Sequence, residues 1–202
     1  MIAAILYKHE IRRKLIHLSS LWIPAAIYFL SDRNALFLFG FLTTCIFSIE
    51  YGRQKNSKVF ILFDKVFGSA LRPGERARGG AMTGAIYMML GTLVCLLFTK
   101  EIAVTATAVL MIADTAAAIV GIKFGKTPIL DKSLEGSVVF LLSGLIVLIA
   151  LSSVMPHGPH YLSSGAAAII AATFVELYSK KLRLNDNFSI PVVTALVMWI
   201  LQ

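Results

Sequence analysis

The stretch Ile102–Ile122 reads IAVTATAVLMIADTAAAIVGI and contains one charged residue, Asp114. A run of about 20 such residues is long enough to cross the roughly 30 Å hydrocarbon core of a bilayer as a helix. Apolar stretches recur along the chain, and they predict spans at Leu15–Leu30, Asn34–Ile49, Gly80–Phe98, Ile102–Ile122, Gly136–Met155, Tyr161–Tyr178 and Phe188–Leu201. The expected fold class is all-α, a polytopic membrane helix bundle of about seven transmembrane helices.

The composition supports this assignment over the whole chain. Of 202 residues, 57% are apolar and 15% are charged, and the mean hydropathy is +0.79. A soluble domain is nearer half apolar and a quarter charged. We therefore expect residues 1–202 to form a single membrane-embedded domain, with any chemistry carried by helices and short loops. Cys45 and Cys95 both lie in apolar spans and are expected to be small core residues.

The connection between the second and third spans has a different pattern. Apolar residues recur at i, i+3 and i+4 spacing from Val59 to Ala70, and charged residues such as Lys65 and Arg72 occupy other positions. This spacing predicts an amphipathic helix that lies in the membrane interface, or a re-entrant segment.

The distribution of basic residues predicts the orientation. The N-terminal segment holds four of the nineteen Lys and Arg residues, the 51–79 connection seven, and the 123–135 and 179–187 loops three each; only Arg33 and Lys100 remain. The positive-inside rule places the basic side in the cytoplasm. The N-terminus and the site are then cytoplasmic and the C-terminus lies on the opposite side. Topology explains the net charge of +8, and no nucleic-acid-binding motif is present.

Asp114 is the first functional signal, because a carboxylate inside a bilayer costs a few kcal/mol unless it faces water, a cation or another helix. At helical spacing Asp114 shares a face with Ala117, Ala118 and Gly121. This helical face therefore consists of small residues and one carboxylate. Two interpretations stay open at this point: a helix-packing stripe with Asp114 bonded to a neighbour, or a metal ligand or base in a cytoplasmic cavity.

The loop that follows reads GIKFGKTPILDKSLEGS, residues 121–137. Gly121 and Gly125 allow backbone to approach a ligand, Lys126 and Lys132 supply positive charge, and Ser133 with Glu135 is expected to cap the next helix. Glycine amides, lysines and a helix N-terminus suit a di- or triphosphate, and Glu135 is available to hold Mg²⁺. An ordinary cytoplasmic loop with a capping acid is the alternative.

Further acids lie toward the same leaflet. Glu176 falls near the end of its span, and Asp186 precedes the last helix, where it could simply cap that helix. Together with Asp114 and Glu135 these acids favour a divalent-cation site.

The entry to the first span reads EIRRKLIH. Glu10, Arg13, Lys14 and His17 fall on one helical face. The sequence favours a membrane anchor for Lys14, whose long side chain would snorkel to the cytoplasmic interface. This interpretation is weaker for His17, which lies about one turn inside the membrane.

These motifs resemble the CTP-dependent polyprenol and lipid alcohol kinases: dolichol kinase, phytol kinase and CTP-dependent diacylglycerol kinase. The matching stretches are Glu10–His17, Arg72–Gly91, Asp114–Gly125 (D-x-x-A-x-x-x-G-x-x-F-G), Lys132–Ser137 (K-S-L-E-G-S) and Asp186–Pro191 (D-N-F-S-I-P). The resemblance implies a membrane kinase that moves the γ-phosphate of CTP, with Mg²⁺, to a lipid hydroxyl. The chain is shorter than the eukaryotic dolichol kinases, and nothing in it identifies the lipid.

The resemblance and the residue chemistry together give the candidate roles. Asp114, Lys132, Glu135 and His17 are the candidate catalytic residues, and Asp114, Glu135, Glu176 and Asp186 the candidate metal ligands. The candidate nucleotide-binding residues are Gly121, Phe124, Gly125, Lys126, Ser133, Gly136 and Arg13.

Two other functions are compatible with the sequence: a CTP:phosphatidate cytidylyltransferase and a non-enzymatic membrane carrier. The small-xxx-small spacing of Gly80 and Gly84 could pack helices within one chain or in a homo-oligomer.

Overall fold

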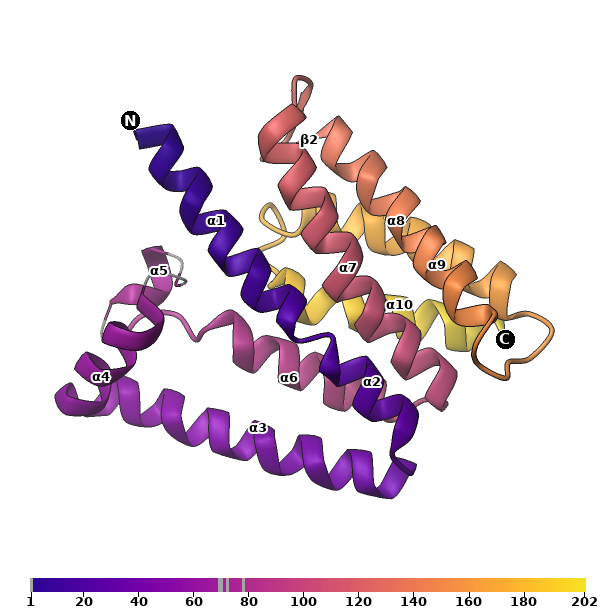
Figure 1. Cartoon of the computed structure of the whole chain (residues 1–202), viewed down its shortest axis with the longest axis horizontal. Coiled ribbons are helices and arrows are strands. Elements are labelled where there is room, and N and C mark those ends of the chain that lie inside the picture. Colours follow the sequence, from indigo (N-terminus) through magenta and orange to yellow (C-terminus); the bar gives the residue numbers. More distant parts are fainter. Residues whose placement is uncertain (1, 69–70, 72, 78) are drawn as a thin grey trace.

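The structure of the chain is a computed structural model that describes residues 2–68, 71, 73–77 and 79–202. The elements are α1 (Ile2–Ser19), α2 (Trp22–Phe29), α3 (Asp32–Lys55), α4 (Ser57–Phe67), α5 (Pro73–Arg76), α6 (Gly84–Cys95), α7 (Lys100–Phe124), β1 (Pro128–Ile129), β2 (Lys132–Ser133), α8 (Leu134–Ser152), α9 (Tyr161–Tyr178) and α10 (Asp186–Leu201). The described residues thus form an all-α bundle with a single two-stranded hairpin (Figure 1).

Helix α7 lies at the centre of this bundle. It packs against α1, α2, α8 and α10. In its most apolar stretch of 18 residues, 78% of the stretch is buried inside the protein, whereas the share is 22–39% in the corresponding stretches of α3, α8 and α9. The outer helices instead expose large apolar side chains, among them Phe37, Phe41 and Ile146. Such an apolar exterior around a buried helix is the arrangement expected in lipid.

In the described part of the chain, four helices, α3, α7, α8 and α9, are long and apolar enough to cross a membrane. They agree with four of the seven predicted spans. The other three predicted spans are interrupted or short: α1 and α2 share the first, α6 has 12 residues and α10 has 16. The coarse prediction of an integral membrane helix bundle is confirmed, while length and composition alone support four crossings.

The break in the first predicted span has a local cause. The backbone N–H groups of Ser20 and Leu21 donate to carbonyls three residues back, at 3.1 Å each, so the helix tightens and ends. Pro24 lies in the first turn of α2, where its missing N–H is tolerated but could not continue the ladder of α1. Hydropathy does not detect such a turn, because both helices are apolar.

The predicted amphipathic helix is present as α4. Asn56 caps its N-terminus by accepting a hydrogen bond from the Lys58 N–H at 2.9 Å, and Ile61, Leu62 and Val66 are exposed on its surface. The predicted segment extends to Ala70, which lies outside the described residues, as does Arg72.

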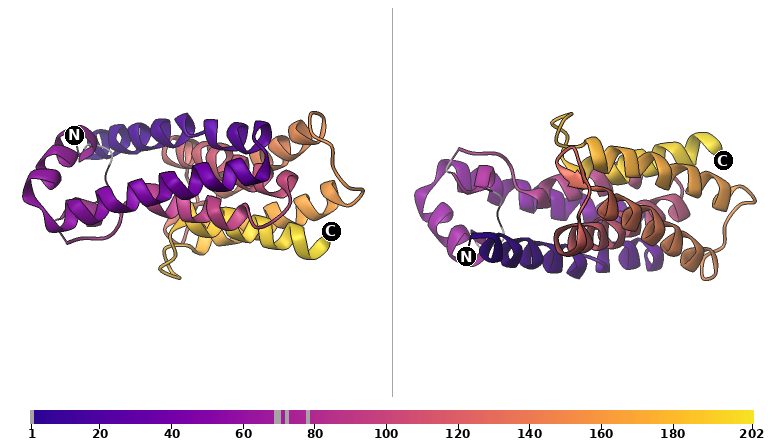
Figure 2. Two further views of the ribbon diagram at one scale, coloured as in Figure 1. Left: turned by 90° about the horizontal axis from the view of Figure 1, so that it is seen from below. Right: turned by 90° about the horizontal axis from the view of Figure 1, so that it is seen from above.

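One end of the bundle collects the polar elements. Helices α7 and α9 end there, α8 and α10 begin there, and the β1–β2 hairpin lies at this end. Figure 2 shows that α1, α3 and α4 extend beyond it on one side. Cys95, the last residue of α6, is buried as predicted, whereas Cys45 in α3 is half-buried; both are free thiols.

Candidate functional site

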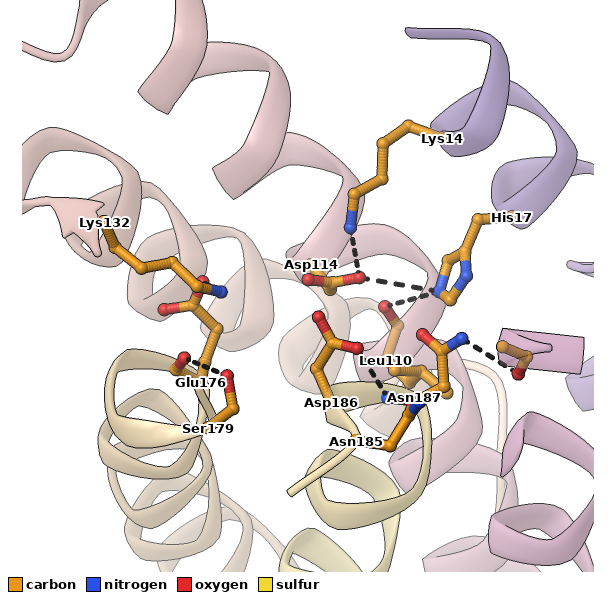
Figure 3. Close-up of polar contacts among 11 residues, drawn as sticks. Lys14, His17, Leu110, Asp114, Lys132, Glu176, Ser179, Asn185, Asp186 and Asn187 are labelled. Atoms are coloured by element: carbon orange, nitrogen blue, oxygen red, sulfur yellow. Dashed lines mark hydrogen bonds and ion pairs between the residues drawn. The ribbon is translucent and has the colours of Figure 1, made fainter. Parts of the chain in front are cut away.

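Asp114 on α7 forms a buried ion pair with Lys14 on α1 (Figure 3). Both side chains are at most 5% exposed. The reading of Lys14 as a snorkelling anchor is wrong, because its ammonium group turns inward to Asp114. The physical reason is that a carboxylate buried in the central helix needs a counter-ion, and breaking such a pair typically costs about 3–5 kcal/mol.

His17 lies one turn after Lys14 on the same face of α1. Its Nε2 atom is 3.3 Å from the backbone carbonyl oxygen of Leu110 and 3.8 Å from Oδ2 of Asp114. The predicted grouping of Lys14 and His17 on one helical face is therefore present. Arg13 is half-buried beside them, and the side chain of Glu10 lies outside the described residues.

Asp186 approaches Asp114 from the start of α10. Asn185, not Asp186, is the N-cap of this helix; its side chain accepts the N–H of Asn187 at 3.1 Å, a donor that Asp186 Oδ1 shares at the same distance. Because Asn185 is the cap, the Asp186 side chain can point toward Asp114, as Figure 3 shows. The side chain of Asn187 donates to the Gly84 carbonyl on α6 at 2.9 Å and ties the two helices together.

A second ion pair joins Lys132 on β2 to Glu176 on α9. Glu176 is 3% exposed, and its Oε2 atom has no hydrogen-bond partner among the residues that the structure describes. Lys132 and Asp186 both lie near enough to Asp114 for their charges to interact with its carboxylate. The two pairs are thus parts of one buried charge cluster, built from α1, α7, β2, α9 and α10.

The loop between α7 and α8 folds into the hairpin that carries Lys132. Ser133 is the N-cap of α8, as predicted, and its hydroxyl accepts the Gly136 N–H at 3.2 Å. The carboxylate of Glu135 accepts the Thr127 N–H at 3.1 Å. Glu135 therefore closes the loop and does not join Asp114 and Asp186. Phe124 and Lys126 are exposed near this loop.

Glycines 121, 125 and 136 gather around the Ser133 side chain. A Cβ atom on Gly136 would lie 3.1 Å from the Ala117 carbonyl oxygen and 3.3 Å from the Gly121 Cα. On Gly125 it would lie 2.7 Å from the Ser133 hydroxyl. These glycines let α7, α8 and the hairpin pack closely, and their predicted approach to a nucleotide stays a prediction.

The predicted metal ligands divide among three places. Glu135 closes the loop, Glu176 pairs with Lys132, and Asp114 and Asp186 come together. Within the described ranges, no three His, Cys, Asp or Glu side chains are arranged to hold a metal ion. Mg²⁺ commonly uses one or two protein carboxylates together with substrate phosphates, and the Asp114–Asp186 pair fits that donor set.

Sequence reasoning missed a separate buried cluster at the end of α3. Arg53 is fully buried, pairs with Glu50, and donates to the Glu75 carbonyl at 2.7 Å and the Ala81 carbonyl at 3.2 Å. Glu50 also accepts a hydrogen bond from Thr83 at 3.2 Å. The i, i+3 spacing of Glu50 and Arg53 at the end of an apolar span was the available signal.

Comparisons with known proteins place the chain in a family. It is 34% identical over 188 residues to an uncharacterized protein of Rickettsia prowazekii, covering 92% of this chain and 91% of that protein. The chain therefore belongs to the same family as this relative.

Two further relatives extend the comparison. The chain is 28% identical over 211 residues to CTP-dependent diacylglycerol kinase 1 of Schizosaccharomyces pombe, covering 96% of this chain and 94% of the kinase. It is 31% identical over 119 residues to an uncharacterized protein of Methanocaldococcus jannaschii, 57% of each chain. No family model and no solved structure matches the chain. The similarity to the kinase supports the lipid kinase resemblance drawn from the motifs.

Proposed function

We propose that this protein is a CTP-dependent lipid alcohol kinase, which transfers the γ-phosphate of CTP to the hydroxyl of a membrane isoprenoid alcohol or diacylglycerol. The observation that carries the proposal is the buried cluster in which Asp114 contacts Lys14, with His17 and Asp186 beside it. The similarity to a CTP-dependent kinase over nearly the whole chain supports it. The products are CDP and the lipid phosphate.

The charge cluster suits phosphoryl transfer, which depends mainly on positioning and on neutralising the phosphate oxygens. Lys132 has 23% of its side chain exposed and can exchange Glu176 for a phosphate. Lys126, Arg13 and the loop backbone at Gly121, Phe124, Gly125, Ser133 and Gly136 would bind the rest of the nucleotide. The hairpin thus brings CTP to one side of Asp114.

Asp114 and Asp186 would hold Mg²⁺ at this site. When bound, the ion would supply positive charge that neutralises the phosphate oxygens. Glu135 and Glu176 lie in the surrounding layer and stay in the proposed ligand set as alternatives. His17, beside Asp114 on the α1 side, would contact the acceptor hydroxyl and orient it, and the hydroxyl proton would pass to a carboxylate of the cluster.

The proposed orientation has the cluster at the cytoplasmic leaflet. The broken α1–α2 unit, α6 and α10 would complete seven crossings. At about 1.5 Å per residue the 12-residue α6 spans about 18 Å, and the segments beside it would cover the remaining thickness. Labelling of single cysteines at exposed Lys126 and His157 from either side of sealed vesicles tests this, because the proposal places them on opposite faces.

The function is tested by phosphate transfer. Purified protein in detergent with Mg²⁺ and γ-³²P-CTP is offered farnesol, geranylgeraniol, phytol, undecaprenol and diacylglycerol in parallel reactions. Label in a lipid phosphate, separated by thin-layer chromatography, supports the proposal and identifies the acceptor class. Parallel reactions with γ-³²P-ATP and γ-³²P-GTP establish the donor preference.

Two outcomes contradict the kinase proposal. Label that appears only in pyrophosphate, together with a CMP-bearing lipid by mass spectrometry, indicates cytidylyl transfer. No consumption of CTP with any acceptor, in protein whose thermal unfolding is cooperative, points to a carrier.

A further inference from the structure

A cavity of about 360 Å³ lies on the α1 side of the charge cluster. Its lining comes from α1, α3, α4, α5, α6 and α10, and the cavity is partly open to the outside. Lys14, His17 and Asn187 line it and also belong to the cluster around Asp114 (Figure 3). The cavity is therefore continuous with the candidate site.

The other walls of the cavity are mostly apolar. Ile16 of α1, Ile46 and Ile49 of α3, Phe63 and Phe67 of α4 and Met88 of α6 contribute large apolar side chains. The amphipathic helix α4 thus closes one side. Glu50 and Glu75 also line the cavity, so buried charged groups accompany these mostly apolar walls. Such a mixed lining matches a ligand that has a polar head on an apolar chain.

The proposed reaction has two substrates, and the loop proposed to bind the nucleotide does not line this cavity. Lys132 and the hairpin reach the cluster from α7 and α8, neither of which lines the cavity. The buried Lys14 and His17, 4% and 8% exposed, stand between the cavity and Asp114. A hydroxyl placed against them would lie beside the proposed phosphate donor.

We infer that this cavity binds the head and the first part of the apolar chain of the acceptor lipid; the inference rests on the proposed kinase function. At about 30 Å³ for each water-sized group, the volume holds about a dozen heavy atoms. The hydroxyl and about the first ten carbons would lie inside, and the remainder of a longer chain lies outside. Acceptor use therefore depends on chain length only up to about that point.

A tryptophan substitution separates this pocket from other lipid contacts. Ile46→Trp fills the cavity, and Ile146→Trp makes the same change on α8, where Ile146 is 66% exposed. We expect Ile46→Trp to raise the KM for a long-chain acceptor at least about tenfold, which corresponds to lost contact with about two methylene groups. The KM for CTP stays within about twofold, and Ile146→Trp behaves as the unmodified protein.

A chain-length series gives the second kinetic readout. With alcohols of increasing length, kcat/KM should rise to about ten carbons and then level off, and Ile46→Trp should move that limit to shorter chains. A continued rise beyond about ten carbons, or equal effects of the two tryptophan variants, overturns the inference while transfer itself continues.

Photolabelling tests where the lipid chain binds without requiring turnover. A long-chain alcohol with a diazirine near its tenth carbon is irradiated with the protein in the absence of CTP, and the labelled peptides are mapped. Label on α3, α4 and α6 supports the cavity, and label confined to α8 and α9 overturns it. If no nucleotide supports transfer but the label is in the cavity, the proposed function fails and the lipid site stands.

Discussion

Lys14 and Asp114 lie 100 positions apart in the sequence and form an ion pair between α1 and α7 that is shielded from solvent. His17, one turn along α1, has Nε2 3.8 Å from the same carboxylate oxygen. The first helix is thereby joined to the central helix by charge as well as by packing. A single substitution in this pair both removes a candidate catalytic group and leaves an unpaired charge buried. Comparing single and double variants of Lys14 and Asp114 separates these two effects.

Lys14→Met should lower the free energy of unfolding by about 3–5 kcal/mol, because Asp114 is left buried without its counter-ion. The double variant Lys14→Met/Asp114→Leu should recover most of that loss while remaining inactive. Thermal unfolding in detergent measures the change, and Lys58→Met, at an exposed lysine of α4, is the control. Equal unfolding temperatures for the two single lysine variants would show that the pair adds no stability.

Asp114→Asn should reduce phosphate transfer at least about a hundredfold, the size of effect seen when a group that stabilises transition-state charge is removed. The amide can still accept a hydrogen bond from Lys14, so thermal unfolding in detergent should stay cooperative even though loss of the ion pair lowers stability. Asp32→Asn is the matched control, because the Asp32 side chain is 84% exposed at the other end of the bundle. Near-normal turnover in Asp114→Asn removes this residue from the mechanism.

Lys132→Ala should raise the KM for CTP more than that for the lipid, because its ammonium group is proposed to bind phosphate. The same change leaves the Glu176 carboxylate buried without its ion-pair partner, which would also lower stability. The double variant Glu176→Gln/Lys132→Ala removes that buried charge, so a KM for CTP that stays high in it reflects lost binding. Steady-state kinetics with each substrate varied provide the measurement. Lys123→Ala, at an exposed lysine near the hairpin, is the control. Equal KM values for CTP in Lys132→Ala and Lys123→Ala would exclude Lys132 from the nucleotide site.

Gly136→Ala should destabilise the protein by about 1–3 kcal/mol, the usual cost of overpacking a close contact. The added methyl group would press on the backbone at Ala117 and Gly121, which cannot easily move. Gly40→Ala tests the same substitution in α3, where nothing lies within 4 Å of the new atom, and should be neutral or slightly stabilising. The prediction fails if thermal unfolding does not distinguish the two variants.

Arg53→Met should release the segment that follows α4. Arg53 donates to the carbonyl groups of Glu75 and Ala81, so its loss removes these two hydrogen bonds and the ion pair with Glu50. Limited trypsin digestion should then cleave after Arg76 several times faster than in the unmodified protein, as followed by intact mass. Arg12→Met, at an exposed position on α1, should digest at the original rate.

Hydropathy was sufficient to predict the helices but not every helix boundary. The range Tyr161–Tyr178 is the same in prediction and structure, because a continuous apolar run and a helix coincide there. The α1–α2 break was missed, since it depends on a backbone turn before Pro24. The β1–β2 hairpin was missed because its strands have two residues each, too few for a periodic pattern.

The acids of the site could be selected from the sequence, whereas their partners could not. Asp114 and Glu176 stand out because ionisable residues are rare in apolar spans, and Asp186 was selected because it lies just before the last predicted span. Lys14 looked like an ordinary interfacial lysine, and only its proximity to α7 in three dimensions reveals its role. The Arg53 cluster was hidden for the same reason, because its acceptors are carbonyl groups and carry no side-chain signature.

The position of Asp186 at the start of α10 also bears on how the protein is made. Lys14 and His17 belong to α1, which is synthesised well before α10, the helix that begins at Asp186. The helices that carry both ion pairs are therefore synthesised before Asp186. Completion of the charge cluster is consequently a late event of biosynthesis, and a nascent chain truncated before α10 has Lys14, Asp114, Lys132 and Glu176 without Asp186.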